Sequence, residues 1–465
     1  MSQLGRITFI HAADLHLDSP FQNTSGFSSL WIDRLKESTW GALGKLISLA
    51  IAEKVDFVIL VGDIFDQESY SVKTQLRFMK ELKKLADKQI HTYIVHGNHD
   101  FVKNNVLALS SIERIDSNIG AYVHIFSAEN VQAYSVYKNG EQVAKLYGRS
   151  YWQRHVYENL AAEYIKYIEA ERLEELQRNS QYNSHRRVKN IAVLHGLVGG
   201  NEHHSAYAPA SLDELINSQF GYWALGHVHQ RKIINTSKPV IAYPGNTQGR
   251  HMGEMGECGC YLVNWNDEDI QMEFHSLEAV RWEELYIDLT SLDDEGNSRS
   301  ISHLLVELEQ QLQAFHSTIA RPTIVRLVLT GQTQLYYELR EQSILDYIKE
   351  ELSGTDAYVY EIINNTLPII DIQKLRQQHT LLGQFLSIIH RARFDEDLKA
   401  ELVEQLKPLL NGQRFRNVTS SKKELLGQGG WKALIQADDT QKILDEVERL
   451  GIDIFLTGAE DNECL

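Results

Sequence analysis

Five short polar runs in the sequence carry side chains that could bind metal ions, and each follows an apolar stretch. Their letters are ADLH, GDIFD, GNHD, LHG and GHVH. The side chains with a ligand atom in these runs are Asp14, His16, Asp63, Asp66, Asn98, His99, Asp100, His195, His227 and His229. Carboxylate, amide oxygen and imidazole together suit borderline and hard divalent cations. A metal site would also explain why so many polar groups follow segments that read as buried, where an unpaired polar group is costly.

The segments before these runs read as strands of an α/β fold. Continuous apolar stretches at 7–13, 55–65 and 91–100 alternate with amphipathic helical patterns at 31–54 and 71–88. Such an alternation predicts a layered α/β sandwich whose sheet is at least partly parallel. Sites in these folds form at the carboxyl ends of the strands, so the five polar runs are predicted to converge on one crevice.

Each polar run by itself has an ordinary structural explanation. GDIFD can be a strand followed by a turn, the histidines of GHVH can be a surface pair, and GNHD can form an Asx turn. Their joint occurrence, each after an apolar strand, favours a shared metal site over coincidence. A pair of metals about 3.5–4 Å apart needs a bridging carboxylate and several ligands on each side, and this set is large enough.

The chain is long enough for more than one hydrophobic core. It has 465 residues, so two or three domains are expected. After a charged helix at 161–178, strands dominate up to about residue 279. A small α+β pattern follows at 280–367, and the pattern is almost wholly helical at 368–465. We therefore predict a site-bearing domain at 1–279, a small second domain and a helical C-terminal region.

Composition and charge narrow the classes of function. The formal net charge of −17 counts against a protein that coats nucleic acid by bulk electrostatics. It does not exclude a nucleic-acid enzyme, because bound metals offset carboxylates and a basic partner can hold the polyanion. No apolar run is long enough to span a bilayer, so no membrane association is expected. The N-terminal stretch does not read as a signal peptide, and three cysteines make no disulfide framework, so we expect a cytoplasmic protein.

The five motifs, in the order D-x-H, G-D-x-x-D, G-N-H-D, H-G and G-H-x-H, resemble those of the calcineurin-like metallophosphoesterase superfamily. Within it, the chain is similar to the SbcD-type DNA repair exonucleases. The phrases ADLHLDSPF and YPGNTQGRH resemble the bacterial YhaO subgroup more closely. The resemblance implies a four-layer αββα metallophosphoesterase sandwich at 1–279, a small α+β capping domain at 280–367 and a helical C-terminal region at 368–465.

The resemblance also implies a ligand set for two divalent metals, which in the family are Mn²⁺. One metal would be held by Asp14, His16, Asp63 and His229. The other would be held by Asp63, Asn98, His195 and His227, so that Asp63 bridges the two. His99 would stand free of the metals and face the substrate.

Three further residues are less well defined by the resemblance. Archaeal and eukaryotic relatives carry a catalytic histidine where this chain has Asp66, and bacterial relatives commonly have Asp there. The role of Asp66 is therefore open, although the difference does not imply loss of activity. Arg231 and Arg250 follow motif residues closely and are candidates for contacts with substrate phosphate. The alternative is that both are part of the solvated surface.

The chemistry that this resemblance implies is metal-assisted hydrolysis of a phosphodiester. Two metals would lower the pKa of a shared water so that hydroxide exists near neutral pH. They would also offset the charge that develops in phosphoryl transfer. His99 is the candidate to stabilise or protonate the leaving oxygen, because the unperturbed pKa of histidine lies near neutrality.

Three functions fit these residues. The leading hypothesis is a DNA exonuclease or endonuclease that acts as the nuclease subunit of a repair complex, because 280–367 resembles the capping domain of DNA nucleases in this family. The first alternative is a phosphodiesterase or phosphatase that acts on small nucleotides or phosphoproteins, since fold and site chemistry are shared. The second is a scaffold for an SMC-like ATPase, which the intact ligand set argues against.

The helical C-terminal region carries apolar residues at helical spacing. They are Leu382, Phe385, Leu386 and Ile389, then Leu398, Leu402, Val403 and Leu406, and later Ile443, Leu444, Val447 and Leu450. These helices could pack on one another, but the region is short and a polar stretch interrupts it. SbcD-type nucleases dock such helices onto an SMC-like, SbcC-type ATPase, so the resemblance predicts that partner beside DNA. Homodimerisation is a further assembly that the sequence leaves open.

Overall fold

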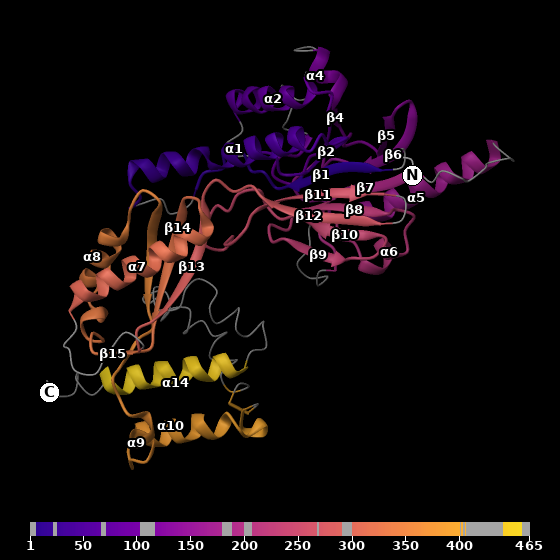
Figure 1. Cartoon of the computed structure of the whole chain (residues 1–465). Coiled ribbons are helices and arrows are strands. Elements are labelled where there is room, and N and C mark those ends of the chain that lie inside the picture. Colours follow the sequence, from indigo (N-terminus) through magenta and orange to yellow (C-terminus); the bar gives the residue numbers. More distant parts are fainter. Residues whose placement is uncertain are drawn as a thin grey trace. The chain divides into compact units, whose positions relative to one another are not determined.

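The computed structural model contains two compact units, residues 1–282 and 283–465, each with its own core (Figure 1). The residues that the structure describes are 6–21, 26–66, 71–102, 117–178, 188–199, 207–266, 269–290, 300–399, 401–402, 405 and 440–457.

The first unit contains two six-stranded sheets that pack face to face. The first has the order β12 (Ile270–Ser276), β11 (Gly259–Trp265), β1 (Ile7–Ala13), β2 (Phe57–Val61), β3 (His91–Val95), β4 (Val123–Ile125). The second has the order β5 (Gln132–Lys138), β6 (Glu141–Gly148), β7 (Lys189–His195), β8 (Tyr222–Gly226), β10 (Val240–Tyr243), β9 (Lys232–Asn235). A buried apolar layer that includes Phe9, Phe57 and Tyr222 joins them.

The register of the central strands brings their carboxyl ends to one level. β1 pairs in parallel with β2, and β2 with β3, so that Ala13, Val61 and Val95 lie side by side. In the second sheet β7 and β8 are parallel, and His195 lies beside Gly226. All five residues of β2 and of β8 are buried, which is typical of parallel strands covered on both faces. Residues that follow these strands therefore lie at the same edge of each sheet.

Helices cover the outer face of each sheet and complete four layers (Figure 1). The first sheet is covered by α1 (Ser29–Ala52), α2 (Val72–Ala86) and α4 (Ser117–Tyr122), and the second by α5 (Leu160–Arg178) and α6 (Leu212–Ile216). The ring of Tyr164 on α5 is parallel to that of Trp223 on β8, with 6.3 Å between ring centroids. The predicted αββα sandwich is confirmed.

A buried histidine ties the two sheets together next to the site. His11 of β1 is fully buried, with its Nδ1 3.0 Å from the Tyr222 hydroxyl and its Nε2 3.0 Å from the Leu225 carbonyl oxygen. Burial lowers the pKa of His11 to about 3, so the ring is neutral at physiological pH. Both ring nitrogens are paired, which makes this polar residue tolerable in the core.

The second unit begins with a small α+β fold. A three-stranded sheet has the order β13 (Arg281–Asp288), β14 (Thr323–Thr330), β16 (Ala357–Asn364). It packs against α7 (Ile301–Ile319) and α8 (Gln342–Leu352), and two further short strands, β15 (Gln332–Thr333) and β17 (Leu367–Pro368), pair with each other. This agrees with the α+β character expected for 280–367, while its status as a separate capping domain stays a prediction.

The C-terminal helices pack on each other. The described elements are α9 (Ile372–Arg376), α10 (Leu381–Ala392) and α14 (Thr440–Thr457). Ile389 of α10 and Leu444 of α14 belong to one buried cluster, and the rings of Phe385 and Phe455 lie 5.7 Å apart. Arg393 pairs with Asp445 of α14 at 2.8 Å.

Two uses were open for the apolar stripes, which are packing on one another and docking a partner. Those of α10 and α14 pack on one another at least in part, because Leu386, Ile389 and Leu444 are buried within the chain. Val403, Leu406 and the side chain of Ile443 lie outside the described residues. The most exposed large apolar side chains in the described part of this region are different ones: Leu381, Phe394 and Ile454 are 73%, 79% and 63% exposed. Among the helices of the described ranges, none combines the length and apolar character needed to cross a bilayer.

Candidate metal centre

The predicted ligand residues come together where the strands of both sheets end. Asp14 follows β1, Asp63 follows β2 and Asn98 follows β3, all in the first sheet. His195 ends β7, and His227 and His229 follow β8, in the second sheet. The crevice is therefore built from two sheets that face each other, because the buried layer between them aligns the two edges.

One group of potential ligands contains Asp14, His16 and His229. Their ligand atoms all lie within 4.8 Å of one another, and Nε2 of His16 is 3.2 Å from Nε2 of His229. His16 and Asp14 are buried, and the side chain of His229 is 30% exposed. Two imidazole nitrogens and a carboxylate at this spacing fit a divalent cation such as Mn²⁺ or Zn²⁺.

A second group contains Asp63, His195 and His227, again with ligand atoms within 4.8 Å of one another. Asn98 joins it, since its Oδ1 is 3.0 Å from Nε2 of His195 and 3.2 Å from Nδ1 of His227. The amide oxygen therefore points at the same place as the two imidazoles. This group too has the mixed nitrogen and oxygen donors that suit a borderline divalent metal.

Asp63 lies between the two groups. Its Oδ2 is 3.9 Å from Nε2 of His16 in the first group and 3.5 Å from Nε2 of His195 in the second. Its Oδ1 accepts a hydrogen bond of 2.9 Å from the backbone N–H of His99. One fully buried carboxylate thus faces the ligands of both groups, which is the arrangement that a bridging ligand requires.

The backbone is strained at the points where it delivers these side chains. Asp14, His16 and Asp63 have φ of 52°, 45° and 48°, in the left-handed region that residues other than glycine rarely adopt. Such outliers gather at functional sites, where the surrounding structure holds them. The strain turns each chain segment sharply at the strand end so that successive side chains face the crevice.

Two glycines make room for the site. A Cβ at Gly62 would lie 2.1 Å from Nδ1 of His195, and one at Gly97 would lie 2.3 Å from Oδ1 of Asp63. Both contacts are far shorter than van der Waals distance, so any side chain there would displace a candidate ligand. Gly62 of GDIFD and Gly97 of GNHD are therefore required because the close packing of the site leaves no room for a side chain.

Two of the four candidate ligand histidines, His16 and His227, are neutral in this environment, whereas the pKa values of His195 and His229 are raised. Burial lowers the pKa of His16 to about 4 and that of His227 to about 3, the latter with help from the nearby charge of His195. Neutral imidazoles keep a lone pair for a metal. The pKa of His195 is raised to about 9, because the negative charge of Asp63 outweighs the effect of burial. The His195 imidazole is therefore protonated at neutral pH in the absence of a metal, and metal binding would release that proton.

His99 forms a third group of potential ligands with His16 and Asp66, whose ligand atoms lie within 4.8 Å of one another, and Asp66 holds its ring. Its Nδ1 is 2.7 Å from Oδ1 of Asp66, and this bond raises the pKa of His99. The other oxygen of Asp66 accepts a hydrogen bond of 2.9 Å from the hydroxyl of Ser19. The side chain of His99 is 30% exposed, unlike the buried His16 and His195. Sequence reasoning left the role of Asp66 open, and the structure places it as the carboxylate that orients His99.

Glu254 is a residue that sequence reasoning missed. Its Oε1 is 2.7 Å from Nδ1 of His229, on the opposite side of the ring from the nitrogen that faces His16. A carboxylate behind an imidazole fixes the ring and its tautomer and makes it a stronger ligand. Glu254 follows no strand and belongs to no motif, so only its position in space reveals it.

The two candidate phosphate contacts have different surroundings. Nη2 of Arg250 is 3.0 Å from Oε1 of Glu254, and its Nη1 is 3.7 Å from Oδ2 of Asp66, so Arg250 borders the site. Arg231 instead lies with its guanidinium 4.0 Å from the ring centroid of Phe274 and 3.6 Å from Glu257. The structure therefore brings Arg250 to the candidate ligands and holds Arg231 on a neighbouring aromatic ring.

Comparison with known proteins agrees with this fold. The sequence model of the calcineurin-like phosphoesterases matches residues 7–231, and that of the middle domain of the metallophosphoesterase YhaO matches 282–362. The chain belongs to the calcineurin-like metallophosphoesterases. It is 35% identical to the uncharacterized metallophosphoesterase YhaO of Bacillus subtilis over 351 residues. This stretch covers 76% of this chain and 78% of that protein.

More distant relatives carry the name Mre11. The chain is 26% identical over 275 residues to the DNA double-strand break repair protein Mre11 of Methanocaldococcus jannaschii, covering 57% of this chain and 64% of that protein. It is 28% identical over 425 residues to the Mre11 protein of Sulfurisphaera tokodaii, covering 87% and 98%. The predicted membership of the superfamily and the predicted likeness to YhaO are confirmed.

Proposed function

We propose that this protein is a dinuclear-metal-dependent nuclease that hydrolyses phosphodiester bonds of DNA as part of a repair complex. The observation that carries the proposal is the position of Asp63, with one oxygen 3.9 Å from His16 and 3.5 Å from His195. A carboxylate that faces both ligand groups in this way is expected of a site for two metals, because a site for one metal has no second group to face.

The proposed ligands divide as the two groups do. One metal is assigned to Asp14, His16, Asp63 and His229, and the other to Asp63, Asn98, His195 and His227. When bound, such metals, which we take to be Mn²⁺, lower the pKa of water and stabilise negative charge on phosphate. The chain's own contribution is to hold these donors on strained, buried backbone so that they need no rearrangement to receive the cations.

His99 is the proposed acid for the leaving oxygen. Asp66 raises the pKa of His99, which favours the protonated ring at neutral pH, and fixes Nδ1 so that Nε2 is left for the substrate. Arg250 stands next to this pair, 3.7 Å from Asp66, and is the proposed contact for a phosphate oxygen beside the scissile one. Arg231 is left out of this assignment because it rests on Phe274.

DNA is the proposed substrate, and support for it comes from the relatives. The Mre11 relatives are named for DNA double-strand break repair, and one of them is covered over 98% of its length. The similarity to YhaO does not separate DNA from other phosphodiesters, because that protein is described as uncharacterized. A phosphodiesterase of small nucleotides, or a phosphatase, would use the same site chemistry and is the alternative.

An SMC-like ATPase is the proposed partner of the C-terminal helices. The stripes of α10 and α14 are used within the chain, so the docking surface would have to consist of what remains exposed. Leu381, Phe394 and Ile454 are apolar and at least 63% exposed, which suits a helix-binding groove of another protein. Such a partner could also supply the positive charge for DNA that this acidic chain lacks.

The test is hydrolysis of linear duplex and single-stranded DNA with Mn²⁺, run beside hydrolysis of bis-p-nitrophenyl phosphate. We expect cleavage of DNA and of the small diester, and loss of both on chelation of the metal. A preparation with its metals that cleaves the small diester and leaves every DNA substrate intact would favour the alternative. A preparation that cleaves neither would refute the enzymatic assignment. End-labelled DNA in the same assay separates exonuclease from endonuclease cleavage.

A further inference from the structure

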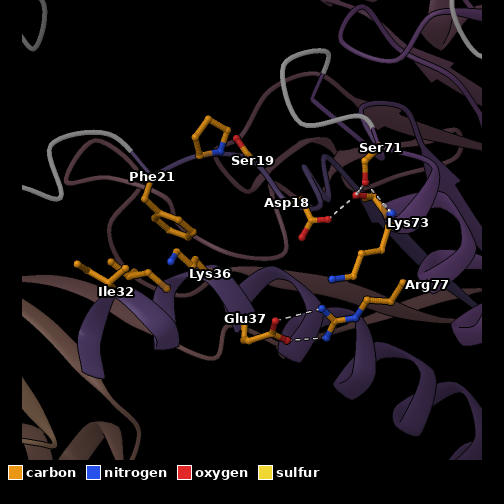
Figure 2. Close-up of a pocket in the computed structure, with 12 residues that line it drawn as sticks. Asp18, Ser19, Phe21, Ile32, Lys36, Glu37, Ser71, Lys73 and Arg77 are labelled. Atoms are coloured by element: carbon orange, nitrogen blue, oxygen red, sulfur yellow. Dashed lines mark hydrogen bonds and ion pairs between the residues drawn. The ribbon is translucent and has the colours of Figure 1, made fainter. Parts of the chain in front are cut away.

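A pocket of about 540 Å³ lies beside the candidate metal centre, between the loop that follows β1 and the helices α1 and α2 (Figure 2). Its lining residues are Asp18, Ser19, Pro20, Phe21, Ile32, Leu35, Lys36, Glu37, Ser71, Lys73, Thr74 and Arg77. Pockets of this size hold ligands as large as a nucleotide.

The floor of the pocket is fixed by hydrogen bonds. The carboxylate of Asp18 accepts one of 2.6 Å from Nε1 of Trp40 and one of 2.6 Å from the hydroxyl of Thr74. The backbone at Asp18 has a φ of 58°, so this conformation is held by its partners. On the opposite side, Glu37 binds Arg77 through two hydrogen bonds of 2.5 and 3.1 Å. The pocket is thus preformed, and the carboxylates of Asp18 and Glu37 are already hydrogen-bonded within the chain.

The remaining charged groups make the pocket positive. Lys36 and Lys73 are both exposed, and Figure 2 shows the side chain of Lys73 reaching into the space between Asp18 and Glu37. Lys36 makes only a loose pair of 3.9 Å with Asp33, and its side chain is 69% exposed. With three cations and two carboxylates in the lining, the pocket has a surplus of one positive charge in a chain whose net charge is −17. An anionic ligand is favoured by these groups.

One wall of the pocket is apolar. Pro20, Phe21, Ile32 and Leu35 contribute it, and Figure 2 shows the ring of Phe21 facing the interior above Lys36. An aromatic ring next to lysines is a combination that binds a nucleic-acid base by stacking and its phosphate by charge. Inorganic phosphate alone would make no contact with the apolar wall, so this wall favours a ligand that also carries an apolar group.

The pocket is joined to the candidate catalytic groups through Ser19. Ser19 lines the pocket, and its hydroxyl donates a hydrogen bond of 2.9 Å to Asp66, which in turn contacts His99 at 2.7 Å. Nη1 of Arg250 lies 3.4 Å from the same hydroxyl. A ligand in the pocket is therefore next to the residues proposed to handle the leaving oxygen and the phosphate.

We propose that this pocket binds the nucleotide adjacent to the scissile phosphodiester, with its base against Phe21 and its phosphate between Lys36 and Lys73. The proposal rests on the proposed function and makes it more specific, because it assigns a unit of the polynucleotide to a place on this chain. It predicts that substrates with a nucleoside on each side of the cleaved bond are hydrolysed with a higher kcat/KM than simple diesters.

The test begins with binding in EDTA, where no hydrolysis occurs. Deoxyadenosine monophosphate is titrated into the full-length protein and into Phe21→Leu, Lys73→Ala and Lys80→Ala variants. Lys80 lies on α2, is exposed and does not line the pocket, so its variant is the matched control. We expect Phe21→Leu and Lys73→Ala each to weaken binding roughly tenfold, as loss of a stack or of a charged hydrogen bond does, and Lys80→Ala to leave it unchanged.

Two results would overturn the proposal. One is that the nucleotide binds no better than inorganic phosphate and is indifferent to Phe21→Leu. The other is equal weakening by Lys73→Ala and Lys80→Ala, which would indicate only diffuse electrostatic attraction.

Hydrolysis separates this proposal from the function on which it rests. With Mn²⁺, the ratio of kcat/KM for a DNA oligonucleotide to that for bis-p-nitrophenyl phosphate should fall roughly tenfold in Phe21→Leu, since the small diester has no base to stack. An unchanged ratio in an active enzyme would refute the pocket and leave the nuclease assignment standing. If the unmodified protein hydrolyses neither substrate but still binds the nucleotide, the nuclease assignment is refuted and the proposal for the pocket is retained.

Discussion

Glu254 and His229 are joined by a contact of 2.7 Å between Oε1 and Nδ1 that fixes one imidazole of the candidate metal centre from behind. The Nε2 of the same ring faces Nε2 of His16 at 3.2 Å. Arg250 donates to Glu254 from its backbone N–H at 2.9 Å and from its side chain at 3.0 Å, so the carboxylate is itself held in place. Glu254 and Arg250, which are not themselves candidate ligands, therefore hold His229 of the centre in place.

We expect Glu254→Gln to weaken metal binding without unfolding the protein. The neutral amide still pairs with His229 but no longer makes the imidazole a stronger ligand, so the affinity for Mn²⁺ should fall roughly 10–100-fold. Calorimetric titration of the metal-free protein with Mn²⁺ measures this. Glu257→Gln is the control, because Glu257 is 46% exposed and pairs with Arg231 away from the ligands. Equal affinity in the two variants would show that Glu254 does not support the metal.

Asp63→Asn should remove both metals together. Asp63 faces His16 and His195 with the same oxygen, so the loss of its charge weakens both groups at once. Plasma mass spectrometry of the purified variant should find neither metal at stoichiometric level, and diester hydrolysis should be lost. A variant that retains two metals with normal turnover would refute the bridging assignment.

His99→Ala should separate chemistry from binding. His99 lies outside the two proposed ligand sets, so the variant should keep its metals and its affinity for DNA. Its turnover should fall by roughly 10²–10⁴, the usual effect of removing a positioned acid or base. Asp66→Asn should give a smaller loss, because the imidazole remains but its orienting carboxylate does not. Metal loss in His99→Ala would instead identify His99 as a ligand.

His11 should make the protein less stable in acid. Its pKa is about 3 in the folded state against an unperturbed 6.5, so only the unfolded state takes up its proton between these values. Its stabilising contribution is complete above pH 6.5 and declines as the pH falls toward 3, by on the order of 3 kcal/mol at pH 4. Urea unfolding at pH 7 and pH 4 measures the decline.

The matched variant for this effect is His11→Gln, which retains a donor and an acceptor for the Tyr222 hydroxyl and the Leu225 carbonyl. It should lose less stability than the unmodified protein between pH 7 and pH 4. The same decline in both proteins would assign the acid sensitivity to other groups.

The exposed apolar residues of the C-terminal helices should decide ATPase binding. We expect Leu381→Asp and Phe394→Asp to weaken co-purification with an SMC-like ATPase roughly tenfold or more, as loss of an interface anchor does. Leu173→Asp on α5 is the control, since Leu173 is also exposed, at 61%, but lies in the first unit.

Deletion of 371–465 should abolish the complex and leave Mn²⁺-dependent hydrolysis of a small diester largely intact. Undiminished binding by the truncated chain would exclude these helices as the docking element. Loss of small-diester hydrolysis in the same protein would make them part of the catalytic fold.

The ligand types and their places at strand ends could be read from the sequence because both are local properties. An apolar stretch that ends in Asp14, Asp63 or His195 predicts a buried strand followed by a polar turn, whatever packs on it. The periodicity of α10 likewise predicted an apolar face. It could not predict that α14 would cover that face, since a stripe shows which side is buried and does not identify the neighbour.

The sequence by itself determined the family of the chain, the alternation of strands and helices in its first hundred residues, and most of the candidate ligands, whereas β4, β5 and β6 were not predicted. The resemblance predicted which of these residues would meet, but only the tertiary structure shows how distant segments bring them together. His16 and His229 are 213 positions apart and face each other only because β1 and β8 lie in sheets joined by a shared core. Glu254 and Ser19 acquire their roles only from their neighbours in space. Local pattern reflects the conformation of a segment, whereas contacts between distant segments depend on sheet register and packing, which no short stretch of sequence contains.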